Sequence, residues 1–239
     1  MKKLSIIIPV YNEEKTVGKL LKKVLSVKFP VASVEYIVVD DGSTDASATA
    51  ISNFQFPISN YKFIKHKRNL GKGAAVRTGL QKATGDYIVI QDADLEYNPA
   101  DIIRLLHELE KSKKPVVYGT RLKRLPNLKK DEHTPVFLMH YVGNKFLSLT
   151  TSILYRHWLT DMECCYKLMP REALTKMQLH AKGFDFEPEI TAKLLKRGYK
   201  IAEVTIVTRP RSYQEGKKLY ALRDGTKALW TLLKYRFVE

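Results

Sequence analysis

Two aspartates separated by a single residue, Asp92 and Asp94, are the clearest sign of chemistry in this sequence. They follow the apolar run 86–91, and a strand that ends there would turn both carboxylates toward one small volume. Carboxylates this close repel each other unless a cation joins them, and Mg²⁺ or Mn²⁺ with phosphate and water oxygens suits this role. Glu96 adds a third candidate ligand. The simpler alternative is an exposed acidic turn that caps a helix beginning at Pro99.

Two more polar clusters follow apolar runs of the same type. Residues 40–45, Asp-Asp-Gly-Ser-Thr-Asp, offer carboxylate acceptors for the hydroxyl groups of a ribose and for a base. The segment 9–13 provides the ring of Tyr11 for stacking on a base, with the carboxylate of Glu13 beside it. Both clusters have a structural alternative, because Asp, Asn, Gly and Ser also form turns and helix caps.

A glycine-rich segment, 69–79, lies between these clusters and the two aspartates. It places Lys72 between Gly71 and Gly73, but it lacks the GxxxxGK[ST] spacing of a P-loop and the GxGxxG spacing of dinucleotide-binding folds. The glycines instead predict a tight turn into a helix, whose first turn and Lys72 would lie near a bound phosphate. A turn that serves only packing is an equal alternative.

The apolar pattern predicts the elements that would position these groups. The expected strands are 4–9, 35–40, 61–66, 86–91, 115–119 and 201–207, and the expected helices are 13–28, 71–83, 99–109, 136–155, 187–197 and 224–239. Strands that are apolar on both faces and alternate with helices predict an α/β fold with a mainly parallel central sheet flanked by helices. Ligands bind such sheets beyond the carboxyl ends of the strands, where the three polar clusters would meet.

Composition limits the classes to which the protein can belong. Of its 239 residues 44% are hydrophobic, which predicts a single domain over 1–239 with a sizeable core and excludes disorder or a fibre. The net charge of +16 favours nucleic acid, an anionic membrane surface or phosphorylated small molecules as partners. The adjacent Cys164 and Cys165 predict free thiols in a reducing compartment. The sequence shows no signal peptide and no membrane-spanning run, so a cytoplasmic protein is expected.

Five motifs occur in order along the chain. They are Pro9-x-Tyr-Asn-Glu13, Asp40-Asp-Gly-Ser-x-Asp45, Asn69-x-Gly-Lys-Gly-x-Ala-x-Arg-x-Gly79, Asp92-Ala-Asp94 and Gly119-Thr-Arg121. In this order they resemble family 2 glycosyltransferases, which have the nucleotide-diphospho-sugar transferase (GT-A) fold. Within that family the chain is similar to the dolichyl-phosphate mannose or glucose synthase branch. The similarity extends over nearly the whole chain and is strongest over residues 5–121.

The resemblance implies that residues 1–121 form a nucleotide-sugar-binding half. The donor would be a UDP- or GDP-linked glucose or mannose. The residues implied to bind it are Pro9, Tyr11, Glu13, Val38, Asp40, Asp41, Lys72, Asp92, Ala93 and Asp94. Asp94 would be the principal ligand of Mg²⁺ or Mn²⁺, together with Asp92 and with Glu96, at whose position relatives often carry Gln.

The resemblance further implies that residues 122–239 form an acceptor-binding half with a closing amphipathic helix. The implied catalytic residues are Asp94, Arg121, Arg211 and Lys217, and the implied acceptor-binding residues are Arg121, Lys145 and Glu187. Arg211 and Lys217 match a basic loop that closes over the donor diphosphate. Together these residues would stabilise the negative charge that develops on the departing nucleotide diphosphate.

The implied acceptor is a polyprenyl phosphate, dolichyl or undecaprenyl, reached from the cytoplasmic face of a membrane. Its phosphate oxygen is already anionic, so a single inverting displacement needs positioning rather than a strong base. A hydroxyl acceptor in a cell-surface glycan is the alternative and would need a base, for which Asp161 and Glu187 are candidates. The helix 136–155 either dips into the membrane interface or belongs to the core. Many relatives carry carboxyl-terminal membrane spans, and none is expected here.

Two other functional classes fit less well. A nucleic-acid-binding module would explain the charge, but the sequence shows no signature of such a fold, and the carboxylate clusters would repel phosphates without a cation. No nucleic-acid partner is therefore expected. A sugar nucleotidyltransferase would carry a glycine-rich basic loop after the first strand, where this chain has residues 9–13 instead.

Overall fold

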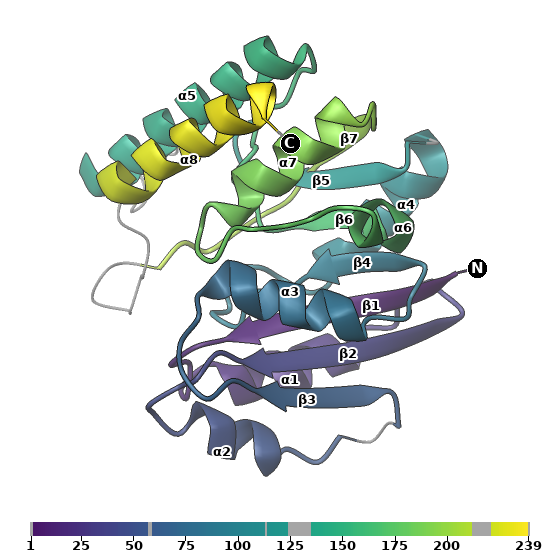
Figure 1. The fold of residues 1–239 in the computed structure, drawn as a ribbon. Helices are drawn as coiled ribbons and strands as arrows, with labels where there is room; N and C mark the ends of the chain where they lie inside the picture. Colours follow the sequence, from purple (N-terminus) through teal and green to yellow (C-terminus); the bar gives the residue numbers. More distant parts are fainter. Residues whose placement is uncertain (1, 57–58, 113, 124–134, 212–220, 239) are drawn as a thin grey trace.

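A seven-stranded sheet forms the centre of the protein (Figure 1). The computed structural model describes residues 2–56, 59–112, 114–123, 135–211 and 221–238. The strands are β1 (Lys3–Val10), β2 (Ser33–Asp40), β3 (Tyr61–Lys65), β4 (Tyr87–Ile90), β5 (Val116–Thr120), β6 (Lys167–Pro170) and β7 (Ile201–Thr205). In the order β3-β2-β1-β4-β6-β5-β7, neighbours pair in parallel except that β6 is antiparallel to β4 and β5. The predicted α/β fold with a mainly parallel sheet is confirmed.

Helices cover both faces of this sheet. They are α1 (Val17–Ser26), α2 (Ser47–Ser52), α3 (Lys72–Lys82), α4 (Asp101–Ser112), α5 (Pro135–Tyr155), α6 (Arg171–Thr175), α7 (Phe186–Lys196) and α8 (Ala221–Phe237). The sequence did not predict α2, β6 or α6. The two helices are short, and β6 begins with the fully buried Lys167, which breaks the apolar pattern that identifies the other strands.

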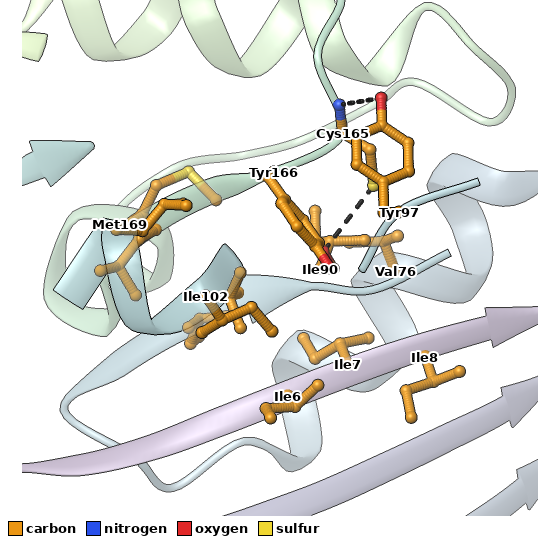
Figure 2. Close-up of a cluster of buried hydrophobic side chains, with 14 of the residues drawn as sticks. Ile6, Ile7, Ile8, Val76, Ile90, Tyr97, Ile102, Cys165, Tyr166 and Met169 are labelled. Carbon is orange, nitrogen blue, oxygen red and sulfur yellow. Dashed lines mark hydrogen bonds between the residues drawn. The ribbon is translucent and has the colours of Figure 1, made fainter. Parts of the chain in front are cut away.

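The central strands are buried on both faces, as an uninterrupted apolar run predicts. Ile6, Ile7 and Ile8 of β1 are all fully buried, although successive side chains of a strand point to opposite faces. Figure 2 shows them in the core beside Ile90 of β4. Two layers of helices, with α3 in front of the sheet and α1 behind it in Figure 1, exclude water from these side chains.

Two glycines set where α3 begins and how closely it approaches the sheet. A Cβ atom added at Gly79 would lie 2.5 Å from Cγ2 of Ile7, so only glycine allows this helix to pack so closely on β1. At the other end, Gly71 has a φ of +96°, and an added Cβ would lie 2.2 Å from the carbonyl oxygen of Lys182. The first residue of α3, Lys72, is therefore held at the edge of the sheet.

The register of the strands brings their carboxyl ends to that same edge. Val10 at the end of β1 pairs with Asp40 at the end of β2, and Ile7 of β1 pairs with Ile90 at the end of β4. The loops that follow β1, β2 and β4 consequently leave the sheet on one side. These are the loops that carry the three polar clusters.

A second group of helices, α5, α7 and α8, packs beyond β6, β5 and β7 (Figure 1). Their contacts enclose a smaller core, which contains Leu147, Met162, Ala192, Ala228, Leu232 and Tyr235. No helix within the described ranges has the length and hydrophobicity that crossing a bilayer requires. Cys164 and Cys165 are buried free thiols, which agrees with the sequence prediction.

A buried carboxylate, Glu35, joins β1, β2 and the turn before β4. Only 4% of its side chain is exposed, and its oxygens accept hydrogen bonds from the Ser5 hydroxyl and from the backbone N–H groups of Thr84 and Gly85. Burial alone would raise the pKa of Glu35, but the hydrogen bonds from Ser5 and Thr84 outweigh burial and lower the pKa to about 2.

We expect Glu35→Gln to lower the free energy of unfolding by about 2 kcal/mol at pH 7, because the amide cannot accept all of these hydrogen bonds. Since the pKa of Glu35 is lowered on folding, its contribution is present above the unfolded-state pKa and is lost as the pH falls toward 2. Urea unfolding between pH 7 and pH 3 measures the effect. Glu172→Gln, at an exposed carboxylate of α6, is the control. An equal cost of the Glu35 substitution at all pH values would contradict this account.

Candidate active site

A cavity of about 710 Å³ opens at the edge where β1, β2 and β4 end. Among the residues expected to form the site, those that line it are Pro9, Tyr11, Glu13, Asp41, Lys72, Asp92, Ala93, Asp94, Glu96, Arg121, Glu187 and Arg211. The structure thus brings together residues from both halves of the chain. The expected donor-binding and acceptor-binding groups face a single space.

Three of the expected site residues that the structure describes are not part of this lining. Val38 and Asp40 lie fully buried in β2, and an oxygen of Asp40 accepts a hydrogen bond from the backbone N–H of Ser43. Lys145 of α5 donates to the carbonyl of Leu122, which itself lines the cavity. Lys217 lies outside the described residues. The roles of all the expected site residues, those that line the cavity included, stay predictions.

The loops after β1 and β2 are tied to each other. The side-chain oxygen of Asn12 accepts a hydrogen bond from the Thr44 N–H at 2.8 Å, and the Asn12 N–H donates to the Ser43 hydroxyl at 3.0 Å. Asn12 has a φ of 50°, a left-handed conformation that asparagine tolerates better than most residues. This turn leaves Tyr11 and Glu13, on either side of Asn12, at the wall of the cavity.

Asp41 has a structural task at the cavity wall. Its carboxylate accepts hydrogen bonds from the N–H groups of Leu70 at 3.0 Å and Gly71 at 2.7 Å, and it lies 2.7 Å from Nδ1 of His66. It therefore holds the glycine-rich turn that precedes α3. Asp41 also lines the cavity, and the contact with the nucleotide that the sequence implied for it stays a prediction.

Arg211 joins three carboxylates of the first half of the chain. Its guanidinium forms two hydrogen bonds with Glu13, of 3.0 and 2.9 Å, and lies 3.5 Å from Oδ2 of Asp94. Its backbone N–H donates to Glu96 at 3.0 Å. Burial raises the pKa of Asp94 to about 7, and repulsion from Asp92 and Glu96 adds to this shift. The carboxylates are so crowded that even Arg211 offsets their repulsion only in part.

The turn that carries these carboxylates is itself unusual. Leu95, between Asp94 and Glu96, has a φ of 64°, which is strained for a branched side chain. The conformation allows the Glu96 N–H to donate to Oδ1 of Asp94 at 3.0 Å, so the backbone turns back toward the Asp94 carboxylate. Strain of this kind persists only where surrounding contacts fix it, and here the turn brings Asp94 and Glu96 to one side of the cavity.

Lys72 connects the two halves of the chain across the cavity. Its ammonium lies 3.0 Å from Oδ1 of Asp92 and 2.9 Å from Oε1 of Glu187 at the start of α7. Burial would lower the pKa of Lys72, but the carboxylates of Asp92 and Glu187 outweigh burial and hold the pKa well above its ordinary value. A permanently charged ammonium therefore lies next to the first aspartate of the Asp92–Asp94 pair.

Arg121 is held by a carboxylate that the sequence analysis considered as a base. Asp161 is fully buried and accepts hydrogen bonds from Nε of Arg121 at 2.8 Å, from Nη2 at 2.9 Å and from its backbone N–H at 2.9 Å. Burial would raise the pKa of Asp161, but Arg121 outweighs burial and lowers it. An ionised carboxylate in a two-pronged ion pair does not suit a base, so Asp161 is a positioning partner of Arg121.

The sequence analysis missed several residues of the cavity wall. In addition to the expected residues, Tyr97, Glu163, Phe184, Arg223, Asp224 and Lys227 line it. Glu163 belongs to an acidic stretch, 161–166, that the sequence does show, but nothing local distinguishes an acid in the cavity from one on the surface. Burial raises the pKa of Glu163 to about 8, and repulsion from Glu187 adds to the shift.

Comparison with known proteins shows the family to which this protein belongs. Residues 5–177 match the family described as glycosyl transferase family 2. The chain belongs to this family. The membership agrees with the five motifs in the sequence and with the position of Asp92 and Asp94 beyond the carboxyl end of β4.

Named relatives and solved structures agree with this membership. A dolichyl-phosphate β-glucosyltransferase of Trichomonas vaginalis is 31% identical over 218 residues, which cover 84% of this chain and 62% of that protein. A dolichyl-phosphate β-glucosyltransferase of Dictyostelium discoideum is 29% identical over 216 residues, which cover 85% of this chain and 65% of that protein. The chain thus spans about two thirds of these relatives. Among solved structures, the chain resembles glucosyl-3-phosphoglycerate synthase from Mycobacterium tuberculosis in complex with UDP, with a TM-score of 0.72 at 18% sequence identity. The match covers 100% of this protein and 81% of the synthase, and it shows that the two share a fold.

We expect Asp161→Asn to lower the free energy of unfolding by about 3 kcal/mol, because it leaves the charge of Arg121 without its buried partner. Chemical denaturation measures the loss. The double variant Asp161→Leu, Arg121→Met should recover most of the stability, since it removes both charges. Wild-type stability in Asp161→Asn would show that this ion pair does not hold the cavity wall.

Proposed function

We propose that the protein is a metal-dependent, inverting hexosyltransferase that moves glucose or mannose from a UDP- or GDP-sugar to a polyprenyl phosphate. The observation that carries this proposal is the convergence of Asp92 and Asp94 with Arg211 and Lys72 in one cavity at the carboxyl ends of parallel strands. Family membership supports glycosyl transfer, and the names of the relatives support a dolichyl-phosphate acceptor and a glucosyl donor.

The carboxylates fit a divalent cation that shares its ligands with the substrate. Within the described ranges no group of three His, Cys, Asp or Glu side chains is arranged to hold a metal ion by itself. Mg²⁺ and Mn²⁺ often bind through one or two carboxylates and complete their coordination with substrate phosphates and water. Asp94 and Asp92, with Glu96 beside them, would hold such an ion. The M. tuberculosis synthase has been crystallised with Mn²⁺ and UDP. When bound, the ion supplies positive charge at the departing diphosphate.

The basic residues of the cavity would act on the same diphosphate. Arg211 lies beside Asp94, and its hydrogen bonds to Glu13 keep its guanidinium directed toward the carboxylates until a donor binds. Lys72 lies beside Asp92 and carries a permanent charge. Cations fixed in advance stabilise the charge that develops on the leaving group more than they stabilise the ground state, which lowers the barrier. Lys217 is proposed to assist them.

The surface of α5 supports a lipid acceptor. Val142, Phe146, Leu149 and Ile153, which we call the α5 apolar stripe, recur at helical spacing and are exposed, Phe146 by 55% and Ile153 by 69%. The other side of α5 contributes Phe137, His140, Tyr141 and Asn144 to the cavity wall. One helix thus borders the reaction space and presents apolar side chains outward. The expectation of an interfacial helix fits this exposure better than that of a core helix.

The charge around the α5 apolar stripe suits an anionic bilayer surface. Arg156 at the end of α5 is exposed, as are Lys234 and Arg236 of the neighbouring α8. The whole chain carries a net charge of +16. An exposed apolar stripe flanked by cations is the pattern of a helix that lies in a membrane interface. We therefore propose that the protein binds peripherally at the cytoplasmic face, where a polyprenyl phosphate can reach the cavity.

A second candidate keeps the donor and changes the acceptor. Transfer to a hydroxyl group of a glycan would require a base near the sugar, and the carboxyl group of Glu163 at the cavity wall is the candidate for that task. The lipid phosphate is favoured because it needs no base and because it accounts for the exposed stripe of α5. The acceptor assay below separates the two candidates.

We expect hexosyl transfer when the protein is assayed with UDP- and GDP-sugars, Mn²⁺ or Mg²⁺, and a short-chain polyprenyl phosphate. Asp94→Asn should lower kcat by about 1000-fold or more, because the cation loses its principal ligand. The melting temperature should not fall, since the substitution relieves repulsion among Asp92, Asp94 and Glu96. Radiolabelled product and released nucleotide diphosphate measure turnover.

Asp86→Asn, at the opposite end of β4, is the matched control and should retain wild-type turnover. Chelation of the metal should abolish transfer by the wild type, and added Mn²⁺ should restore it. Product formed only with hydroxyl acceptors would favour the second candidate. Near-normal activity of Asp94→Asn would rule out the assignment of the cation site.

We expect Phe146→Glu combined with Ile153→Glu to reduce binding to anionic lipid vesicles by about tenfold, because two charges must then enter the interface. Turnover of a long-chain polyprenyl phosphate in those vesicles should fall in parallel, whereas turnover of a detergent-free short-chain acceptor should not change. Vesicle sedimentation and the two assays measure these effects. His107→Glu, on the exposed surface of α4, is the control. Unchanged vesicle binding by the double variant would contradict the orientation proposed for α5.

A further inference from the structure

The loop before β6 holds Glu163 in a fixed position at the cavity wall. The ammonium of the fully buried Lys167 donates to the carbonyls of Met162 and Cys164, the two neighbours of Glu163 in the chain. The Cys165 N–H donates to the hydroxyl of Tyr97 at 3.2 Å, as Figure 2 shows. A backbone anchored on both sides of Glu163 gives this side chain little freedom to leave the cavity.

Two carboxyl oxygens at this wall lack protein partners among the described residues. Oε1 of Glu163 and Oε2 of Glu187 are both buried without a hydrogen bond, and both residues line the cavity. The side chain of Glu187 is only 4% exposed, and its other oxygen binds Lys72. A buried polar atom without a protein partner lowers stability, so an oxygen of this kind at a cavity wall is available to accept or donate a hydrogen bond to a bound ligand.

The two carboxyl groups differ in what they can offer that ligand. Burial, with repulsion from Glu187, raises the pKa of Glu163 to about 8, so near neutral pH this group carries a proton and can donate a hydrogen bond. Glu187 is ion-paired with Lys72 and can only accept. Asp161, Lys167 and Arg121 also surround Glu163, and they bind one another or the loop backbone. One donor and one acceptor side by side match a pair of hydroxyl groups.

The position of the pair relates it to the donor diphosphate. The ammonium of Lys72 lies 3.0 Å from Asp92 and 2.9 Å from Glu187. Glu187 therefore lies close to the proposed diphosphate site, with only the ammonium of Lys72 between it and Asp92. A sugar attached to that diphosphate would extend into the part of the cavity that Glu163 and Glu187 line. The free carboxyl oxygens of these two residues match the hydroxyl groups of such a sugar.

We propose that Glu163 and Glu187 together bind hydroxyl groups of the transferred hexose and select among hexoses, with Glu163 as hydrogen-bond donor and Glu187 as acceptor. The inference rests on the proposed function and adds to it the two residues that bind and select the sugar. Epimeric hexoses differ in the direction of one hydroxyl group. A site built to hydrogen-bond a hydroxyl rejects an analogue that leaves its buried polar groups unpaired.

Calorimetric binding with Mn²⁺ tests this role on the intact protein. The ligands are UDP, UDP-glucose, UDP-galactose, GDP and GDP-mannose, and the proteins are the wild type, Glu163→Leu and Glu163→Gln. In Glu163→Leu we expect the affinity for the preferred nucleotide sugar to fall about tenfold or more, while the affinity for the free nucleotide changes less than about twofold. The preference among hexoses should weaken. Glu163→Gln, which keeps a donor and an acceptor, should retain most of both.

Stability separates binding from folding in this experiment. Glu163→Leu removes a buried oxygen without a partner, so its melting temperature should not fall below that of the wild type. Equal losses for free nucleotide and nucleotide sugar would overturn the inference and leave the proposed function intact. A loss of turnover in Glu163→Gln with unchanged sugar binding would instead assign Glu163 as a base and would also overturn it. Failure of the wild type to bind any of the nucleotides would overturn the proposed function itself.

Discussion

Repulsion among carboxylates dominates this structure. Glu13, Asp94 and Glu96 come from loops that the parallel sheet sends to one edge, and each would be more stable in water than in a shared cavity. Arg211 offsets this cost by bonding to Glu13 and Glu96 and approaching Asp94. It reaches them from beyond β7, at the far side of the sheet in the strand order. The repulsion among these carboxylates of the first half is therefore not offset until the rest of the chain has folded around them.

The same dependence appears at the other end of the cavity. Lys72 starts α3, and its place is set by the close contact of Gly79 with Ile7 and by the hydrogen bond from the Gly71 N–H to Asp41. Its ammonium then joins Asp92 to Glu187, which follows Lys72 by more than a hundred positions in the chain. Packing of α3 on the core thus fixes the position of the Lys72 ammonium at the edge of the sheet. The ion pairs of that ammonium then hold Asp92 of the first half of the chain close to Glu187 of the second half. The sheet register and the ion pairs are parts of one arrangement.

Much of the fold was predictable because its signals are local. The uninterrupted apolar runs of β1 and β2 identify buried parallel strands, and the acidic clusters that follow them identify the edge where ligands bind. The partners of charged residues are not local. Nothing near Arg121 in the sequence points to Asp161, which completes its ion pair from forty positions away. Strand β6 was likewise not predicted, because it begins with Lys167. The burial of this lysine depends on backbone carbonyls that only the folded loop supplies.

On the proposed function, helix α5 would couple catalysis to a position at the membrane. His140, Tyr141 and Asn144 face the cavity, while the α5 apolar stripe faces outward. A polyprenyl phosphate has the same division, with a charged head and an apolar chain. If the stripe lies in the bilayer interface, the head can reach the cavity while the chain stays among lipids, so the acceptor need not leave the membrane. On the proposed function, Arg121, which Asp161 holds at the cavity wall, would then be a fixed cation for that phosphate, and Lys145, bonded to the carbonyl of Leu122, would add a second positive charge behind the wall.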